Sequence, residues 1–227
     1  MSQQYTILFD LDGTLVDTAP DLMRAHNHVM KKFGYPTKST EEIRNLVGQG
    51  AGAMLGRSIW GQAKKEFGKV QDEKIKKEMI KVFVDFYGKN IVNESTLIKG
   101  VQKFLIWAKS EGISMAVCTN KQEHLAIDLL KKIGIYNFFE YVAGHNTFEY
   151  CKPDPRHLTS VVEILGGDIK KTLMIGDSET DANAAKNAGI PVILLEDGYT
   201  EKNTSEIYHN HLVKDFIGIE KIVLKYL

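Results

Sequence analysis

Two carboxylates near the start of the chain, Asp10 and Asp12, follow directly on the apolar run Ile7–Phe9. A strand that ends at Phe9 directs both side chains toward the same side of a sheet at its carboxyl edge. Like charges this close repel, so each tends to hold a proton unless a cation neutralises it. Oxygen ligands of this kind suit a hard ion, above all Mg²⁺. The segment by itself leaves a second reading open, a strand followed by an ordinary polar Asp-Gly turn.

The charge balance and the cysteines limit the classes of partner. The 227-residue chain has 29 lysines plus arginines and 29 aspartates plus glutamates, so no net field favours nucleic acid or a membrane surface. Its two cysteines, Cys118 and Cys151, make neither a disulfide framework nor a zinc-ligand cluster, which is typical of a reducing cytosol. No secretory signal and no apolar run near the ~20 residues of a membrane span is visible. We therefore expect a soluble cytoplasmic protein without nucleic-acid or membrane partners.

Residues 17–89 carry helix signals and no convincing strand pattern. Thr18 or its neighbour Asp17 can cap a first helix that Gly34 ends. Ser39 and Glu42 have the spacing of a capping box. Further helices are expected over residues 51–60 and 72–87. This part of the chain is predicted to be all-helical.

After Asn90 the pattern alternates between strand and helix. Short apolar runs typical of buried parallel strands are expected at 113–118, 141–143, 172–175 and 191–195. Helical patterns separate them, which predicts an α/β fold with a parallel sheet and helices on both faces. The strand at Ile7–Phe9 must rejoin that sheet, so the helical stretch is an insertion after strand one. His209 and His211 are expected in a polar C-terminal loop rather than as a metal-binding pair, because no third ligand accompanies them.

Polar clusters follow four of the predicted elements, where ligands of doubly wound sheets bind. They are Asp10 with Asp12, then Thr119-Asn120, then the loop around Lys152, then Gly176-Asp177 through Asp181. Each cluster alone has a plain structural explanation as a turn, a loop or a helix cap. Four clusters in this order, at strand ends that converge by topology, are better explained by a shared site.

These residues resemble the four motifs of the haloacid dehalogenase superfamily, which match Asp10-Leu11-Asp12-Gly13-Thr14, Thr119, Lys152 and Gly176-Asp177 through Asp181. The resemblance spans nearly the whole chain. It implies a Rossmann-like, doubly wound core from residues 1–16 and 90–227. It also implies that residues 17–89 form a C1-type helical cap domain.

The resemblance implies hydrolysis of a phosphate ester in two steps. Asp10 is then the nucleophile that forms an aspartyl-phosphate. Asp12 protonates the leaving group and later takes a proton from the attacking water. Mg²⁺ is the implied cofactor, held by Asp10, Asp177 and the backbone carbonyl of Asp12. Relatives that cleave carbon–halogen bonds lack an aspartate at the position of Asp12, which favours a phosphatase.

The remaining motif residues are implied to bind the phosphate or to support its ligands. Lys152 neutralises both Asp10 and the phosphate, while Thr14, Thr119 and Asn120 hold phosphate oxygens. Two residues lie behind the metal ligands, Ser178 and Asp181; Asp181 orients Lys152 or a metal-bound water.

The helical insert is expected to set the substrate, since it can close over the site. Its segment 43–51 looks like the cap loop of phosphoglycolate phosphatases, and 17–22 and 83–88 are similar to theirs too. Gly48 lets backbone approach a small ligand. Arg44 is a candidate for the glycolate carboxylate, with a structural role as the alternative.

The expected reaction is therefore 2-phosphoglycolate to glycolate and phosphate, with a small phosphorylated metabolite as the partner and a monomer or homodimer as the assembly. Alternatives are another small phosphate ester or pyrophosphate, or a phosphomutase of the β-phosphoglucomutase type. A signalling module that holds phosphate on Asp10 is a further alternative, but receiver domains are shorter and lack the insert.

Overall fold

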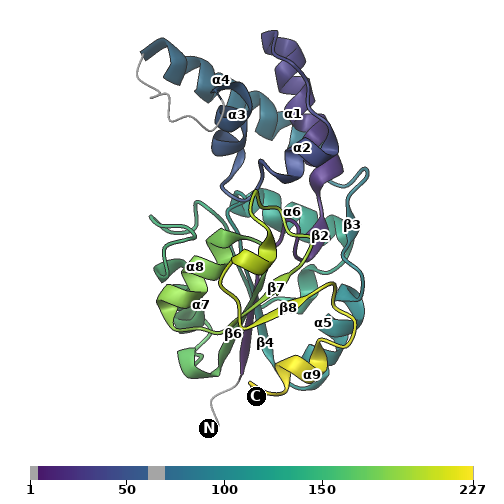
Figure 1. Ribbon diagram of the computed structural model, residues 1–227, viewed down its shortest axis with the longest axis vertical. Helices are drawn as coiled ribbons and strands as arrows, with labels where there is room; N and C mark the ends of the chain where they lie inside the picture. Colours follow the sequence, from purple (N-terminus) through teal and green to yellow (C-terminus); the bar gives the residue numbers. More distant parts are fainter. Residues whose placement is uncertain (1–4, 61–69, 227) are drawn as a thin grey trace.

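The computed structural model describes residues 5–60 and 70–226. A six-stranded parallel sheet forms its core, in the spatial order β5-β4-β1-β6-β7-β8 (Figure 1). The strands are β1 (Thr6–Phe9), β4 (Ser114–Cys118), β5 (Tyr141–Ala143), β6 (Thr172–Gly176), β7 (Val192–Leu195) and β8 (His211–Val213). The first strand of the chain thus lies in the middle of the sheet, between β4 and β6. The predicted α/β, Rossmann-like fold is confirmed.

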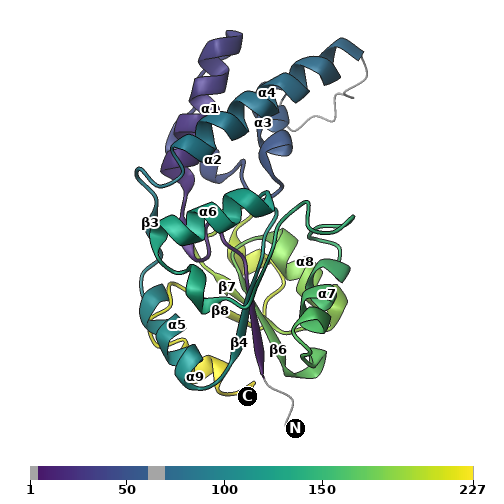
Figure 2. The same ribbon diagram turned by 180° about the vertical axis from the view of Figure 1, so that it is seen from behind.

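Helices cover both faces of this sheet, because alternate side chains of each strand point to opposite faces. Ile7 and Phe9 pack into one buried cluster, with α5 (Val101–Ser110), α6 (Glu123–Ile133) and α9 (Glu220–Val223). Leu8 packs into the other cluster, with α7 (Arg156–Ile164) and α8 (Glu179–Ala188). Figures 1 and 2 show these two groups of helices on opposite sides of the strands. Short 3₁₀ turns lie at Tyr136–Phe138, Ile169–Lys171 and Thr204–Glu206.

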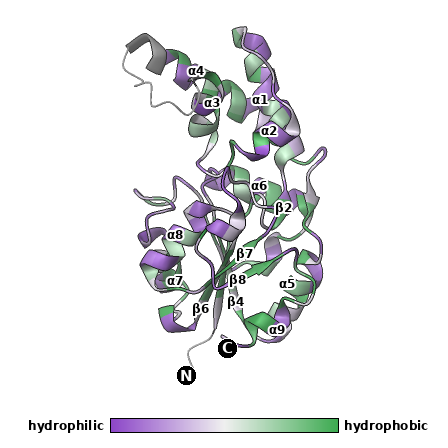
Figure 3. Cartoon of the chain, viewed as in Figure 1, coloured by the Kyte–Doolittle hydropathy of each residue, from purple (hydrophilic) through white to green (hydrophobic). Residues whose placement is uncertain are grey.

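Buried apolar strands fix the position of the carboxyl edge. All four residues of β1 and all five of both β4 and β6 are buried. Figure 3 shows hydrophobic residues concentrated on the strands of the core. Because the strands cannot slide without exposing these side chains, the residues that follow them are held at fixed positions.

A helical layer stands beyond the carboxyl edge of the sheet (Figures 1 and 2). It consists of α1 (Ala19–Phe33), α2 (Thr40–Arg44), α3 (Ala51–Trp60) and α4 (Val70–Lys89), with α4 packed against α1 and α3. The two segments that join it to the core pair as an antiparallel ribbon, β2 (Val16–Asp17) with β3 (Thr96–Leu97). We propose that residues 17–89 act together as a cap; residues 61–69 of that range lie outside the described residues.

Several local expectations are confirmed. Gly34 ends α1 in the left-handed conformation, with φ of 75°. Ser39 Oγ accepts from the Glu42 N–H at 3.2 Å, and the Glu42 carboxylate accepts from the Ser39 N–H at 2.8 Å, as a capping box requires. Thr18 precedes α1, but its side chain makes no capping hydrogen bond. Its hydroxyl donates to Asp12 instead.

The prediction of a polar loop around His211 is wrong, because this residue begins β8, which pairs with β7 at the edge of the sheet. The strand has three half-buried residues and therefore lacks the apolar run that marks the inner strands. Strands β2 and β3 were not predicted either, since two residues carry no periodic signal. Within the described ranges, no helix combines the length and apolar character that a membrane crossing requires.

Candidate active site

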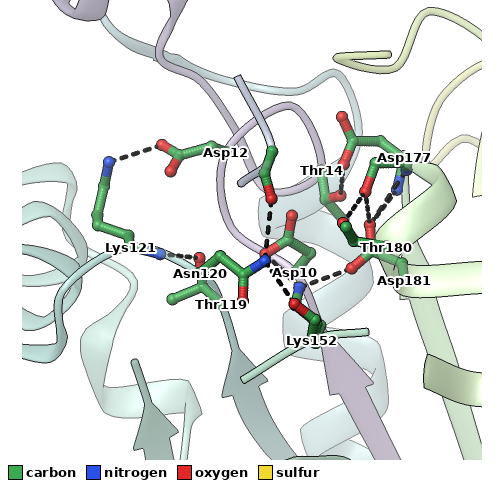
Figure 4. A network of polar contacts seen from close by, with 12 residues as sticks. Asp10, Asp12, Thr14, Thr119, Asn120, Lys121, Lys152, Asp177, Thr180 and Asp181 are labelled. Atoms are coloured by element: carbon green, nitrogen blue, oxygen red, sulfur yellow. Dashed lines mark hydrogen bonds and ion pairs between the residues drawn. The ribbon is translucent and has the colours of Figure 1, made fainter. Parts of the chain in front are cut away.

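The four polar clusters meet at the carboxyl edge of the sheet (Figure 4). Asp10 follows β1, and its backbone N–H donates to the carbonyl of Ile175 in β6, so the ladder extends to the nucleophile candidate itself. Thr119 follows β4, and its N–H donates to Ala143 of β5. Asp177 follows β6 directly. The convergence expected from the topology is therefore observed.

Lys152 lies between two carboxylates. Its Nζ is 2.8 Å from an oxygen of Asp10 and 2.6 Å from an oxygen of Asp181, and its side chain is 1 % exposed. Burial by itself lowers the pKa of a lysine, but Asp10 and Asp181 outweigh this effect and raise the pKa of Lys152 above its ordinary value. The residue is therefore a fixed positive charge beside Asp10.

Three buried carboxylates crowd together at the same place. Oxygens of Asp10, Asp177 and Asp181 lie within 4.8 Å of one another. Burial raises the pKa of Asp10 to about 6, with Asp181 adding to the rise and Lys152 opposing it. Burial, then Asp10 and Asp181, raise the pKa of Asp177 well above its ordinary value. Among the described residues, Lys152 is the cation in direct contact with this group, and it balances one of the three negative charges. Two negative charges on oxygen ligands are left, which fits a divalent hard cation.

Both carboxylate oxygens of Asp181 accept hydrogen bonds from other groups of the protein. One oxygen accepts from Lys152, and the other accepts from the N–H groups of Asp177 and Ser178 at 3.2 and 3.1 Å and from the Ser178 hydroxyl at 2.7 Å. A side chain on Gly176 would collide with the Asp181 carboxylate, which explains the glycine at the end of β6. These contacts are those expected of residues that orient Lys152 and the loop carrying Asp177.

Asp177 is positioned by two donors from separate loops. The Thr14 hydroxyl donates to one of its oxygens at 3.1 Å, and the Tyr199 N–H donates to the other at 2.7 Å. Gly13 has φ of 82°, and a side chain there would overlap both Asp177 and the Tyr199 ring. The position of the Asp177 carboxylate thus depends on the turn after β1 and on the loop after β7.

Asp12 has partners that differ from those of Asp10. The Thr18 hydroxyl donates to one of its oxygens at 2.7 Å, and Lys121 Nζ lies 2.9 Å from the same oxygen. In the view of Figure 4, Asp12 and Lys121 lie on one side of Asp10, and Asp177 and Asp181 lie on the other. The two carboxylates expected to act on the substrate therefore have separate surroundings.

A cavity of about 1030 Å³ opens between the sheet edge and the helical layer, and both Asp10 and Asp12 line it. The expected residues Gly48, Thr119 and Asn120 line it too. The Asn120 side chain donates to the backbone carbonyls of Gly48 and Lys152, both at 3.0 Å, and so ties the helical layer to the core. Other lining residues come from α3, α4, α6 and the loop around Gln49.

A family model described as haloacid dehalogenase-like hydrolase matches residues 7–195. The chain belongs to this family. It is 37 % identical to a phosphoglycolate phosphatase from Mesorhizobium japonicum over 92 % of this chain and 90 % of that protein. It is 37 % identical to another from Caulobacter vibrioides over 98 % of this chain and 92 % of that protein. A crystal structure of a predicted phosphoglycolate phosphatase from Haemophilus somnus superposes with a TM-score of 0.87 at 32 % identity, covering 98 % of this chain and 99 % of that one.

Three residues expected at the substrate of this haloacid dehalogenase-like hydrolase, Thr14, Lys152 and Arg44, do not line the described cavity. Lys152 contacts Asp10, which does line it. Thr14 contacts Asp177 instead. Arg44 forms an ion pair with Asp17 at 2.7 Å, and its guanidinium lies 5.2 Å from the centre of the Tyr199 ring. The binding role expected of Arg44 stays a prediction, and its observed contacts lie at the junction between core and helical layer.

Three residues with close contacts in the site were not anticipated from the sequence. Lys121 directly follows Thr119-Asn120, and a cation beside a motif residue is the signal that could have identified it. Tyr199 donates its N–H to Asp177, accepts at its hydroxyl from the Ala19 N–H at 2.9 Å, and donates that hydroxyl to Asp17. Thr18 was expected only as a helix cap. No sequence pattern encodes the contacts of Tyr199, because one of them uses the backbone.

Proposed function

We propose that this phosphatase hydrolyses 2-phosphoglycolate to glycolate and phosphate through an aspartyl-phosphate on Asp10. The observation that carries the chemistry is the buried Asp10 carboxylate on the cavity wall, 2.8 Å from the Lys152 ammonium and beside Asp177. The names of the relatives from Mesorhizobium japonicum and Caulobacter vibrioides support the substrate.

In the first step, an oxygen of Asp10 attacks phosphorus and the bond between phosphorus and the ester oxygen breaks. Asp12, protonated, gives its proton to that oxygen as glycolate leaves. In the second step, water attacks the phosphorus of phospho-Asp10, Asp12 takes a proton from the water, and the carboxylate of Asp10 is restored. The Thr18 hydroxyl keeps Asp12 oriented through both proton transfers.

Fixed donors on this chain hold the phosphoryl group. Lys152 supplies a positive charge that Asp181 holds in place at 2.6 Å. The Thr119 hydroxyl and the Asn120 backbone N–H, at the cavity wall, donate to phosphoryl oxygens. Because these groups are already in place, little reorganisation is needed as charge develops on the phosphoryl oxygens.

The acidic cluster fits Mg²⁺, which Asp10, Asp177 and the backbone carbonyl of Asp12 would hold. When bound, Mg²⁺ supplies the positive charge that lets an anionic nucleophile approach an anionic ester. Thr14 and Tyr199 keep Asp177 in position for this role. The helical layer is tied to the core through Asn120 and Gly48 and covers the cavity on the side opposite the sheet edge.

A panel of phosphate compounds tests the proposal. With Mg²⁺ present, kcat/KM for 2-phosphoglycolate is expected to exceed that for ethyl phosphate, pyrophosphate and glucose 1-phosphate at least about tenfold. EDTA is expected to lower phosphate release at least about 100-fold, and added Mg²⁺ to restore it. The measurement is released inorganic phosphate, with ionic strength matched by NaCl. Conversion of a sugar phosphate to its isomer without net phosphate release would identify a mutase instead.

A further inference from the structure

Lys121 is a buried cation beside the reaction centre that the proposed steps do not use. It follows β4 and Asn120, and 5 % of its side chain is exposed. Its Nζ lies 2.9 Å from Asp12 and 4.5 Å from the centre of the Tyr87 ring. Lys152 already supplies the charge beside Asp10. Asp12 is the partner of Lys121 in the free protein, and a substrate anion beside this lysine would compensate the same buried charge.

Asp12 does not need Lys121 to be held in place. The Thr18 hydroxyl donates to the same oxygen at 2.7 Å, from the start of the helical layer. The ammonium can therefore turn toward a second anion while Asp12 keeps a donor. Since Lys121 lines the cavity, such an anion can reach it from the substrate side.

Tyr87 supplies a second polar group at the same place. It lies in α4, is 1 % exposed and lines the cavity, and its hydroxyl has no hydrogen-bond partner among the described residues. Its ring stacks on Phe83 with the ring centres 5.8 Å apart, which fixes its orientation. A buried hydroxyl without a partner is unfavourable in the free protein, and a ligand oxygen would satisfy it.

The position of Lys121 matches the leaving group of a phosphate ester. Asp12 protonates the ester oxygen, and in 2-phosphoglycolate a single methylene separates that oxygen from the carboxylate. An anion so close to the ester oxygen lies within reach of Lys121, the cavity-lining cation that contacts Asp12. Two further cations, Arg57 and Lys76, line the cavity from α3 and α4. Arg57 donates to the carbonyls of Leu46 and Val47.

We propose that the Lys121 ammonium and the Tyr87 hydroxyl bind the carboxylate of the leaving group and thereby select esters whose carboxylate is bonded to the carbon that carries the ester oxygen. This rests on the proposed function and names the residues that read its substrate. The cavity is far larger than 2-phosphoglycolate, so its selection requires contacts near Asp12 rather than a close fit of the whole cavity.

The test compares two esters of similar size, 2-phosphoglycolate and ethyl phosphate, in the Mg²⁺-loaded enzyme. Lys121→Met is expected to lower kcat/KM about 100-fold for 2-phosphoglycolate and less than about fivefold for ethyl phosphate. Tyr87→Phe, which keeps the stacked ring, is expected to show about a tenfold loss for 2-phosphoglycolate alone. Lys121→Arg keeps the charge and should retain most of the preference. Lys131→Met is the matched control, because this exposed lysine lies 5.1 Å from the Tyr136 ring outside the site.

Product inhibition gives a readout that does not depend on the chemical step. The inhibition constant of glycolate is expected to rise at least about tenfold in Lys121→Met, while that of inorganic phosphate changes little. Equal losses for both esters, with glycolate inhibition unchanged, would make Lys121 a positioning residue for Asp12 and overturn the proposal. A wild-type enzyme without preference for 2-phosphoglycolate would contradict the proposed substrate instead, and glycolate inhibition would still decide the role of Lys121.

Discussion

Asp10→Asn is expected to lower kcat for every phosphate ester about 10⁴-fold or more, because an amide cannot form the aspartyl-phosphate. The fold should persist. The substitution removes one charge from a crowded group in which burial already raises the pKa of Asp10 to about 6, and Lys152 keeps its contact with Asp181 at 2.6 Å. The measurements are steady-state phosphate release and the free energy of unfolding in urea, which should change by less than about 1 kcal/mol.

A matched substitution outside the site shows how much of the change comes from losing a carboxylate anywhere on the protein. Asp128 lies exposed on α6, so Asp128→Asn should leave kcat and stability unchanged. Substantial turnover by Asp10→Asn, in a preparation free of deamidated protein, would exclude the covalent route.

Lys152→Met is expected to cost both stability and activity. The variant leaves Asp10 and Asp181 buried without the ammonium that contacts both, and such uncompensated charge destabilises a protein by about 3–5 kcal/mol. Loss of the positive charge at the phosphoryl group should also lower kcat about 10²–10³-fold, which is the loss typical of removing one preorganised donor. Urea unfolding and phosphate release measure the two effects, and Lys152→Arg tests whether charge alone suffices if the methionine variant does not fold.

An exposed ion pair provides the control for Lys152. Lys202 Nζ lies 2.6 Å from Glu179, and both side chains are about half exposed. Lys202→Met should cost less than about 1 kcal/mol, because water solvates both charges. Similar losses of unfolding free energy in Lys152→Met and Lys202→Met would show that burial does not set the contribution of the Lys152 contacts to stability.

The core of the site could be predicted because it follows from strand periodicity. Apolar runs locate the strands, a parallel sheet brings their carboxyl ends together, and the residues after them must meet. Asp10, Thr119 and Asp177 were found in this way, whereas Lys152 was assigned from a polar loop before a predicted helix and from the family resemblance. The sequence could also predict a helical insertion after β1, since helix signals fill the stretch before the strand pattern resumes.

Contacts made by loops could not be predicted in the same way. Tyr199 acts through its backbone N–H and a distant hydroxyl contact, neither of which leaves a pattern. Thr18 has the sequence of a helix cap, yet its hydroxyl donates to Asp12. Arg44 was a candidate for the substrate carboxylate with a structural role as the alternative, and the structure pairs it with Asp17, 27 residues away in sequence. In each case the partner is set by tertiary packing rather than by local spacing.

Intermediate capture tests the central claim most directly. The wild-type enzyme and Asp12→Asn, loaded with Mg²⁺, would be mixed with 2-phosphoglycolate, quenched in acid within milliseconds and analysed by peptide mass spectrometry. We expect one phosphoryl group on Asp10, accumulating further in Asp12→Asn because the second step lacks its base. Single-turnover release of phosphate with no phosphorylated Asp10 at any time, or a phosphoryl group on another residue, would contradict the account.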